Sequence, residues 1–173
     1  MLRRLFRIFT QSPDGYLHAN VQAMCSSFKS ELMLGAHQLG AVTIVSRTSL
    51  TAPTKDVVKA ALYLVSASRG AADTVYNSTG EVSGTNYSAG GVTVTNATDP
   101  STSGTTGIWT PSASIVYTTV TLSTAFDAVL IYNSTQSNRA ISVHTFGSQT
   151  VTAGTFTLTM PANDASNALI RIA

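Results

Sequence analysis

The chain has 173 residues, of which 10% are charged, and a formal net charge of +2. This length suits one domain with a real core, and the single cysteine, Cys25, excludes an internal disulfide and a multi-cysteine metal site. The small net charge and the lack of a Lys/Arg stripe argue against a phosphate-binding groove, and no apolar run approaches the roughly 20 residues of a membrane helix. We therefore expect no nucleic-acid partner and no membrane partner, and a protein made in the cytoplasm.

Residues 1–16 are predicted to form an arm outside the main domain. Residues 1–9 alternate basic and apolar side chains, and a turn signal follows at residues 12–15 (SPDG). Two interpretations stay open: an amphipathic segment that touches a membrane, or an arm that docks into a groove on a partner protein. The second is favoured, and its partner-binding residues would be Leu2, Arg3, Arg4, Leu5, Phe6, Arg7 and Phe9.

Residues 17–39 are predicted to form the one long helix, which begins a main domain of residues 17–173. Apolar residues recur at a spacing of three or four and share one face, which we expect to pack on the core. Gly35 is an internal weak point of this helix, and Gly40 suits a C-cap. The apolar face consists of Leu17, Val21, Met24, Phe28, Leu32 and Leu39.

From Ala41 onward the sequence has the alternation and the β-branched residues that are typical of strands. Residues 99–107 (DPSTSGTTG) are predicted to be a low-complexity surface loop, and residues 133–138 a turn. About eight short strands after one helix predict a mainly β fold, a single jelly-roll-like β-sandwich. The predicted strands cover residues 41–46, 57–65, 92–95, 108–109, 114–122, 126–132, 140–146, 155–160 and 167–172.

The stretch from Glu81 to Asn96 (EVSGTNYSAGGVTVTN) is the most distinctive part of the chain. Gly84, Gly90 and Gly91 can take a positive φ or let another backbone approach closely. The spacing of these glycines does not match a phosphate-binding loop, since no GK[ST] follows and no helix opens there. We therefore predict a sharp turn that leads into a strand.

Side chains that could carry chemistry are few and scattered. The histidines are His18, His37 and His144, and no local spacing brings one of them to an acid or a cysteine. Asp127 lies within an apolar run, where we interpret it as a residue on the solvent face of a strand. The loop at Asp99 does not match a calcium-binding spacing. We expect no catalytic residue, no metal and no cofactor.

Three further segments carry a resemblance to a known family. Residues 28–40 (FKSELMLGAHQLG) are similar to an early helix that ends in a His-x-Leu-Gly turn. Residues 58–62 (VKAAL) and 81–91 (EVSGTNYSAGG) are similar to a Lys-bearing strand and a Gly-x-x-Tyr-x-Ala-Gly-Gly turn. The third segment comprises Trp109, residues 128–135 (AVLIYNST), Phe146-Gly147 and residues 151–158 (VTAGTFTL). Together they resemble a group of small virion proteins of tailed bacteriophages that are encoded near the major capsid protein.

The resemblance covers residues 28–172, and the chain departs from the group by extra residues at 1–27 and an insertion at 41–56. It implies a non-enzymatic protein of the virion surface that decorates the head, binds the major capsid protein at capsomer junctions and associates with copies of itself. A neck, tail or baseplate component is the alternative within viruses. A carbohydrate-binding β-sandwich, in which Trp109 and tyrosines stack on sugar, is the alternative from another class. The contact loops would be residues 1–27, 41–56 and 99–107.

Overall fold

The computed structural model describes residues 30, 32–35, 56–95 and 98–173. The predicted arm, the predicted strand at residues 41–46 and most of the predicted helix lie outside the described residues. Residues 30 and 32–34 are helical, and Gly35 follows them with a φ of +70° and donates its N–H to the carbonyl of Leu32 at 3.0 Å. Gly35 therefore ends a helical turn, as a left-handed C-cap does, whereas the sequence predicted an interior position.

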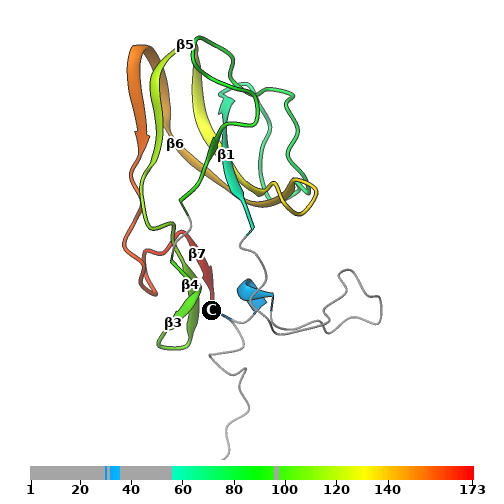
Figure 1. Ribbon diagram of the computed structural model, residues 1–173, viewed down its shortest axis with the longest axis vertical. Helices are drawn as coiled ribbons and strands as arrows, with labels where there is room; N and C mark the ends of the chain where they lie inside the picture. The colour runs from blue at the N-terminus through cyan, green and yellow to red at the C-terminus, as the bar shows by residue number, and fades with distance from the viewer. Residues whose placement is uncertain (1–29, 31, 36–55, 96–97) are drawn as a thin grey trace, which may run out of the picture.

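The described chain is mainly β, as predicted, and its strands form two antiparallel sheets (Figure 1). The larger sheet has the order β2-β1-β5-β6, and the smaller one has the order β3-β4-β7. The strands are β1 (Val58–Leu64), β2 (Val92–Thr93), β3 (Ser101–Ser103), β4 (Thr106–Trp109), β5 (Ile115–Asn133), β6 (Arg139–Leu158) and β7 (Ile170–Ile172). Because β1 lies between β2 and the distant β5, the larger sheet forms only when remote parts of the chain meet.

The apolar run at residues 57–65 forms β1, as predicted, and both faces of this strand are buried. Ala60 and Leu62 belong to the main core. Ala61 and Tyr63 belong to a second cluster on the opposite face of the sheet. A central strand with two buried faces has a continuous apolar sequence in place of an alternating one.

The predicted strands at residues 114–122 and 126–132 join into the single strand β5, which forms a long, bent hairpin with β6. The register between the two strands shifts at several points after Tyr117, and Thr119 has a positive φ of +53°. Such irregularities bend a strand and increase its twist. The bend brings the first half of β5 over the larger sheet, where the Tyr117 hydroxyl donates to the carbonyl of Ala60 at 2.9 Å.

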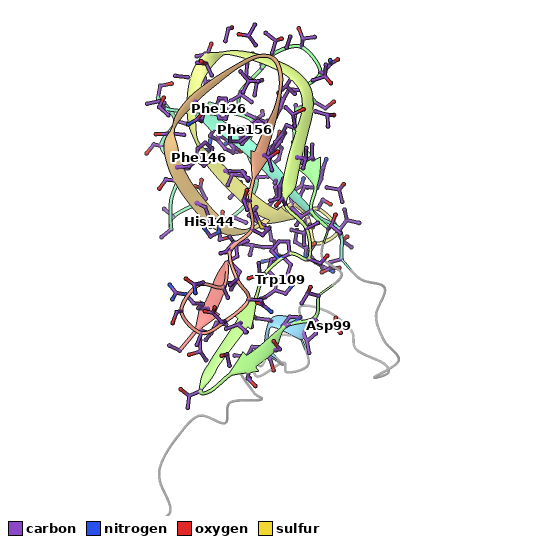
Figure 2. All side chains as sticks on the ribbon, turned by 90° about the vertical axis from the view of Figure 1, so that its left-hand side faces the viewer. Asp99, Trp109, Phe126, His144, Phe146 and Phe156 are labelled. Atoms are coloured by element: carbon purple, nitrogen blue, oxygen red, sulfur yellow. The ribbon has the colours of Figure 1, made fainter. Side chains whose placement is uncertain are left out.

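Three phenylalanines lie side by side inside this bend (Figure 2). The ring centroids of Phe126 and Phe156 are 5.0 Å apart in an edge-to-face arrangement, and those of Phe146 and Phe156 are 5.4 Å apart. Aromatic pairs favour such offset and edge-to-face geometries. Phe156, Leu158 and Met160, which alternate along the predicted strand at residues 155–160, all pack against the main core.

The prediction of a loop at residues 99–107 is wrong, because these residues build the β3–β4 hairpin. Ser103 pairs with Thr106, which leaves a two-residue turn in which Gly104 has a φ of +59°. Glycine suits such a turn, and threonine suits an edge strand, so the low-complexity sequence forms regular structure. Trp109 at the end of β4 lies between the two sheets and belongs to the main core (Figure 2).

Candidate functional site

The carboxylate of Glu81 organises the segment from Glu81 to Gly91. Its Oε1 atom accepts hydrogen bonds from the Tyr87 hydroxyl and from the Gly90 N–H, both at 2.7 Å, and its Oε2 atom accepts one from the Tyr76 hydroxyl at 2.6 Å. The Tyr132 hydroxyl donates to the carbonyl of Gly90 at 2.8 Å. Hydrogen bonds to an ionised carboxylate are short and strong, so Glu81 fixes the turn against the larger sheet.

The glycines of this turn allow backbones to touch, as the sequence predicted. A Cβ atom on Gly84 would lie 1.9 Å from the carbonyl oxygen of Thr121, and one on Gly91 would lie 1.6 Å from that of Ala60. Gly90 and Gly91 also have positive φ values of +88° and +68°. Only glycine combines this backbone conformation with such close contact, so the prediction of a sharp, tightly packed turn is confirmed.

The phenols around Glu81 act as hydrogen-bond donors. Burial raises the pKa of Tyr87 and of Tyr76, and the hydrogen bond that each gives to Glu81 raises it further. Burial also raises the pKa of Tyr63 to about 12. These phenols are neutral near pH 7 and keep the proton that each donates in its hydrogen bond.

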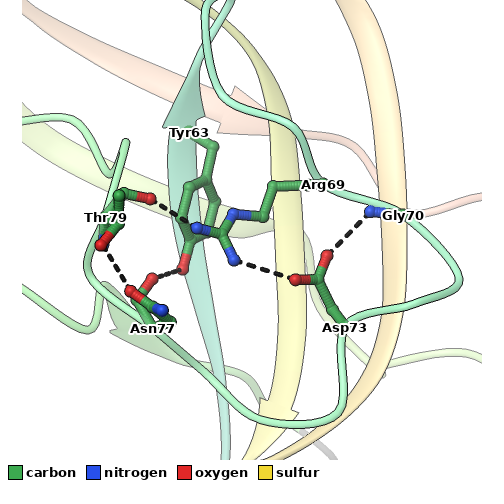
Figure 3. Close-up of polar contacts among 6 residues, drawn as sticks. All are labelled: Tyr63, Arg69, Gly70, Asp73, Asn77 and Thr79. Carbon is green, nitrogen blue, oxygen red and sulfur yellow. Dashed lines mark hydrogen bonds and ion pairs between the residues drawn. The ribbon is translucent and has the colours of Figure 1, made fainter.

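A second polar cluster ties the loop after β1 to the outer face of the larger sheet (Figure 3). Arg69 Nη1 pairs with Asp73 Oδ1 at 2.9 Å, Nη2 donates to the carbonyl of Thr79, and the guanidinium lies 4.4 Å from the centre of the Tyr63 ring. Asp73 Oδ2 accepts the Gly70 N–H at 2.8 Å. The two charged side chains are only 10% and 16% exposed, so water screens this pair less than a typical surface pair.

A shallow groove of about 380 Å³ lies between this loop and the first half of β6. Asp73 is the one carboxylate in its lining, and Arg69 already pairs with it. In the part of the chain that the structure describes, no three His, Cys, Asp or Glu side chains are grouped to hold a metal ion. The lining of the groove consists of Arg69, Gly70, Ala71, Asp73, Leu130, Ala140, Ile141, Ser142, Val143 and Thr145.

The predicted partner-binding residues of the arm, Leu2 to Phe9, lie outside the described residues, and so do His18, His37 and Cys25. Asp127 is half-buried at a register shift of β5, between Phe126 of the main core and Ala128 of the second cluster, so the simple alternation that the sequence predicted is interrupted at this residue. His144 is half-buried on β6, and its Nε2 atom lies 2.9 Å from the hydroxyl of Ser142. Burial lowers the pKa of His144, so this imidazole is neutral at pH 7.

The aromatic side chains that a sugar could stack on are turned inward. Trp109 is only 9% exposed, and its indole N–H donates to the carbonyl of Thr98 at 3.0 Å. Tyr63, Tyr117 and Tyr132 are buried, with exposed fractions of 0–2%. Among residues 56–95 and 98–173, these rings therefore contribute to packing and form no exposed aromatic platform.

The role of Glu81 is not evident from the sequence alone. Its partners Tyr76, Tyr87 and Gly90 lie within ten residues of it, yet no common motif has this spacing. The Arg69–Asp73 pair had a weak signal, since opposite charges four residues apart in a loop of small residues invite a local contact. No helix in the described part of the chain is long and apolar enough to cross a membrane.

Comparisons of the chain with protein-family models, with curated proteins and with solved structures found no match. A functional proposal therefore has to rest on the residues and their geometry.

Proposed function

We propose that this chain is a structural virion protein that decorates a phage capsid and stabilises it by binding the major capsid protein at capsomer junctions. The proposal starts from the sequence resemblance over residues 28–172. A protein of this kind needs a stiff body and many modest contacts that are multiplied by copy number. It would act on the outside of the particle, as one of many copies, without a cofactor and without catalysis.

The observation that carries the proposal is the internal use of reactive groups in the part of the chain that the structure describes. The Glu81 carboxylate, the hydroxyls around it and the Arg69–Asp73 pair all bond to other parts of the same fold. A catalytic site needs at least one such group aimed at a cavity where a substrate can lie. Here these groups hold loops to a sheet, which supports a structural role over an enzymatic one.

The bent β5–β6 hairpin supports the stiffness that this role requires. It lies over the larger sheet and encloses the phenylalanine cluster, while Tyr117 bonds across to β1. Within this proposal, the fold is a single jelly-roll-like sandwich with an N-terminal helix and an extended arm. The arm, residues 1–9, buries Leu2, Leu5 and Phe6 against a capsid subunit, while its arginines pair with carboxylates of that subunit.

Two alternatives lead to different expectations. A neck, tail or baseplate component would be present in few copies at one vertex, whereas a decoration protein covers the shell. A carbohydrate-binding module would need exposed aromatic rings, and the burial of Trp109 does not favour it. Copy number on the particle therefore separates the leading proposal from the first alternative.

The direct test is to add the purified full chain to capsids assembled without it and to image the particles by electron cryomicroscopy. We expect density at junctions between capsomers over the whole shell. Density confined to a single vertex, or no bound protein after sedimentation of the capsids, would refute the proposal.

The arm is tested by deleting residues 2–9 and measuring capsid occupancy. We expect occupancy to fall because the variant loses the apolar and basic contacts of the arm. The control variant replaces Arg3, Arg4 and Arg7 by lysine, which keeps the charge, and it should retain most of the binding. Unchanged occupancy after the deletion would show that the arm does not dock.

A further inference from the structure

β6 forms one edge of the larger sheet, and most of its outer side is unpaired in the described chain. The sheet order places β5 on one side of β6 and no strand on the other. The segment from Thr74 to Tyr76 covers only the start of β6. The Tyr76 N–H donates to the carbonyl of Asn138 at 2.8 Å, and the Ala140 N–H donates to the carbonyl of Thr74 at 3.0 Å. Beyond Ala140, no described strand pairs with this edge.

The sequence of this edge lacks the features that keep exposed strands apart. Between Ala140 and Leu158 there is no Lys, Arg, Asp, Glu or Pro. Soluble proteins usually protect a long edge strand with such residues or cover it, because its free N–H and C=O groups recruit another strand. The pairing with β5 shifts register on either side of residues 142–145 but is regular between them, so this uncharged stretch, which no described strand pairs on its outer side, indicates a strand that takes a partner.

The chemistry of the edge favours an identical copy as that partner. Two antiparallel copies of β6 would bring no like charges together, since the one titratable side chain, His144, is neutral at pH 7. Threonine recurs at positions 145, 150, 152, 155 and 157, and Thr–Thr pairs across antiparallel strands are favourable. A strongly charged partner segment would meet no opposite charge along this edge.

An exposed apolar side chain also marks this edge. Ile141, at the start of the unpaired part of β6, is 43% exposed, which is unusual for a large apolar side chain. A contact along the edge would cover it.

We propose that this chain self-associates through β6, with the edges of two copies paired antiparallel from about Ile141 onward. Seven paired residues span roughly 23 Å, so the contact is small and the dimer is weak, in the micromolar range. The inference goes beyond the proposed function and does not depend on it, because it concerns free protein in solution.

The test measures the association of the full chain by sedimentation velocity over a range of concentrations. Ile141→Lys and Thr145→Lys place a charge at the edge and should each weaken the dimer at least tenfold. Val116→Lys is the matched control, since Val116 is a β-branched residue of similar exposure, 41% against 43%, on β5. It should leave association unchanged. Thermal unfolding of each variant shows whether it is folded.

Three outcomes would overturn the inference. One is a wild-type chain that stays monomeric up to about 1 mM, a concentration at which a micromolar dimer would be almost fully formed. Another is a dimer that neither edge lysine weakens although both variants are folded. The third is a dimer that Val116→Lys weakens as much as Ile141→Lys does. Binding to capsids is measured separately, so a failure of self-association and a failure of the proposed function can be told apart.

Discussion

The turn from Glu81 to Gly91 and the outer edge of β6 belong to the same half of the molecule and treat their polar groups in opposite ways. In the turn, the Glu81 carboxylate accepts three hydrogen bonds, and Gly91 touches the backbone of Ala60. Along β6 beyond Ala140, the outer backbone groups meet no described strand. The contrast separates two tasks: the turn makes the body rigid, and the edge leaves hydrogen-bonding capacity for contact.

The largest expected effect is unfolding at high pH, because ionisation of the buried phenols destabilises the rigid region. Burial raises the pKa of Tyr63 to about 12 and also raises that of Tyr117 and Tyr132. A raised folded-state pKa stabilises the native protein fully below the unfolded value of about 10, and the stabilisation disappears as the pH rises towards the folded value. Each buried tyrosine should cost about 1.4 kcal/mol per pH unit in this window.

Absorbance of tyrosinate and circular dichroism, recorded together between pH 9 and about 12, provide the measurement. Both signals should change in one transition, because the phenols ionise when the chain unfolds. Full ionisation of the tyrosines in a chain that keeps its native circular dichroism would contradict the rigid packing.

The next largest effect is expected for Gly91→Ala. Its Cβ atom would lie 1.6 Å from the carbonyl oxygen of Ala60, at a φ of +68°. We expect a loss of at least about 3 kcal/mol in the free energy of unfolding, measured by urea denaturation. Gly104→Ala is the matched control: its φ is +59°, and no atom lies within 4 Å of the added carbon. It should cost only about 1 kcal/mol, which reflects the left-handed backbone alone; equal losses would show that close approach is unimportant.

Glu81→Gln is expected to cost about 2 kcal/mol, because the amide nitrogen cannot accept a hydrogen bond and at least one donor loses its partner. If the nitrogen replaces Oε2, the Tyr76 hydroxyl is affected; if it replaces Oε1, the Tyr87 hydroxyl and the Gly90 N–H are affected. Asp127→Asn, at another half-buried carboxylate, should change the free energy of unfolding by less than about 0.5 kcal/mol. If the two variants were equally stable in urea, Glu81 would not be the centre of the turn.

The smallest effect concerns His144 on the open edge. Burial lowers its pKa, so the neutral imidazole stabilises the fold above the unfolded value of about 6.5, and this contribution is lost as the pH falls below it. His144→Asn should remove at most about 1 kcal/mol of pH dependence between pH 7 and 5. The stability of the wild type minus that of the variant isolates this histidine from the others, and it should decrease as the pH falls from about 7 to 5. An increase of this difference as the pH falls would contradict the assignment.

The sequence identifies individual strand segments better than it identifies which segments continue into one strand. β1 and the inward face at Phe156 follow from local pattern, because apolar runs and alternation depend on neighbouring residues. The union of residues 114–122 with 126–132 depends on irregular pairing with β6, which no local pattern reports. The β3–β4 hairpin was missed because its Ser/Thr/Gly sequence suits a loop and an edge strand equally.

In the candidate sites, too, some features could be predicted from the sequence and others could not. The close packing of Gly84 and Gly91 was predictable, since glycine clusters imply positive φ or backbone contact. The cluster at Glu81 was not, because it combines Tyr76 before the turn with Tyr87 inside it, while Tyr132 of β5 bonds to Gly90. The open edge of β6 depends on the order of strands in a sheet, and this order is a property of the whole fold.

The position of β1 between β2 and β5 has a consequence for synthesis. β1 precedes its partner β5 by about fifty residues along the chain, and the hydroxyl of Tyr117 reaches back 57 positions to Ala60. Contacts so distant in sequence form slowly. While the ribosome makes the intervening residues, an apolar strand destined for burial on both faces stays uncovered, so the nascent chain exposes this strand until the hairpin closes over it.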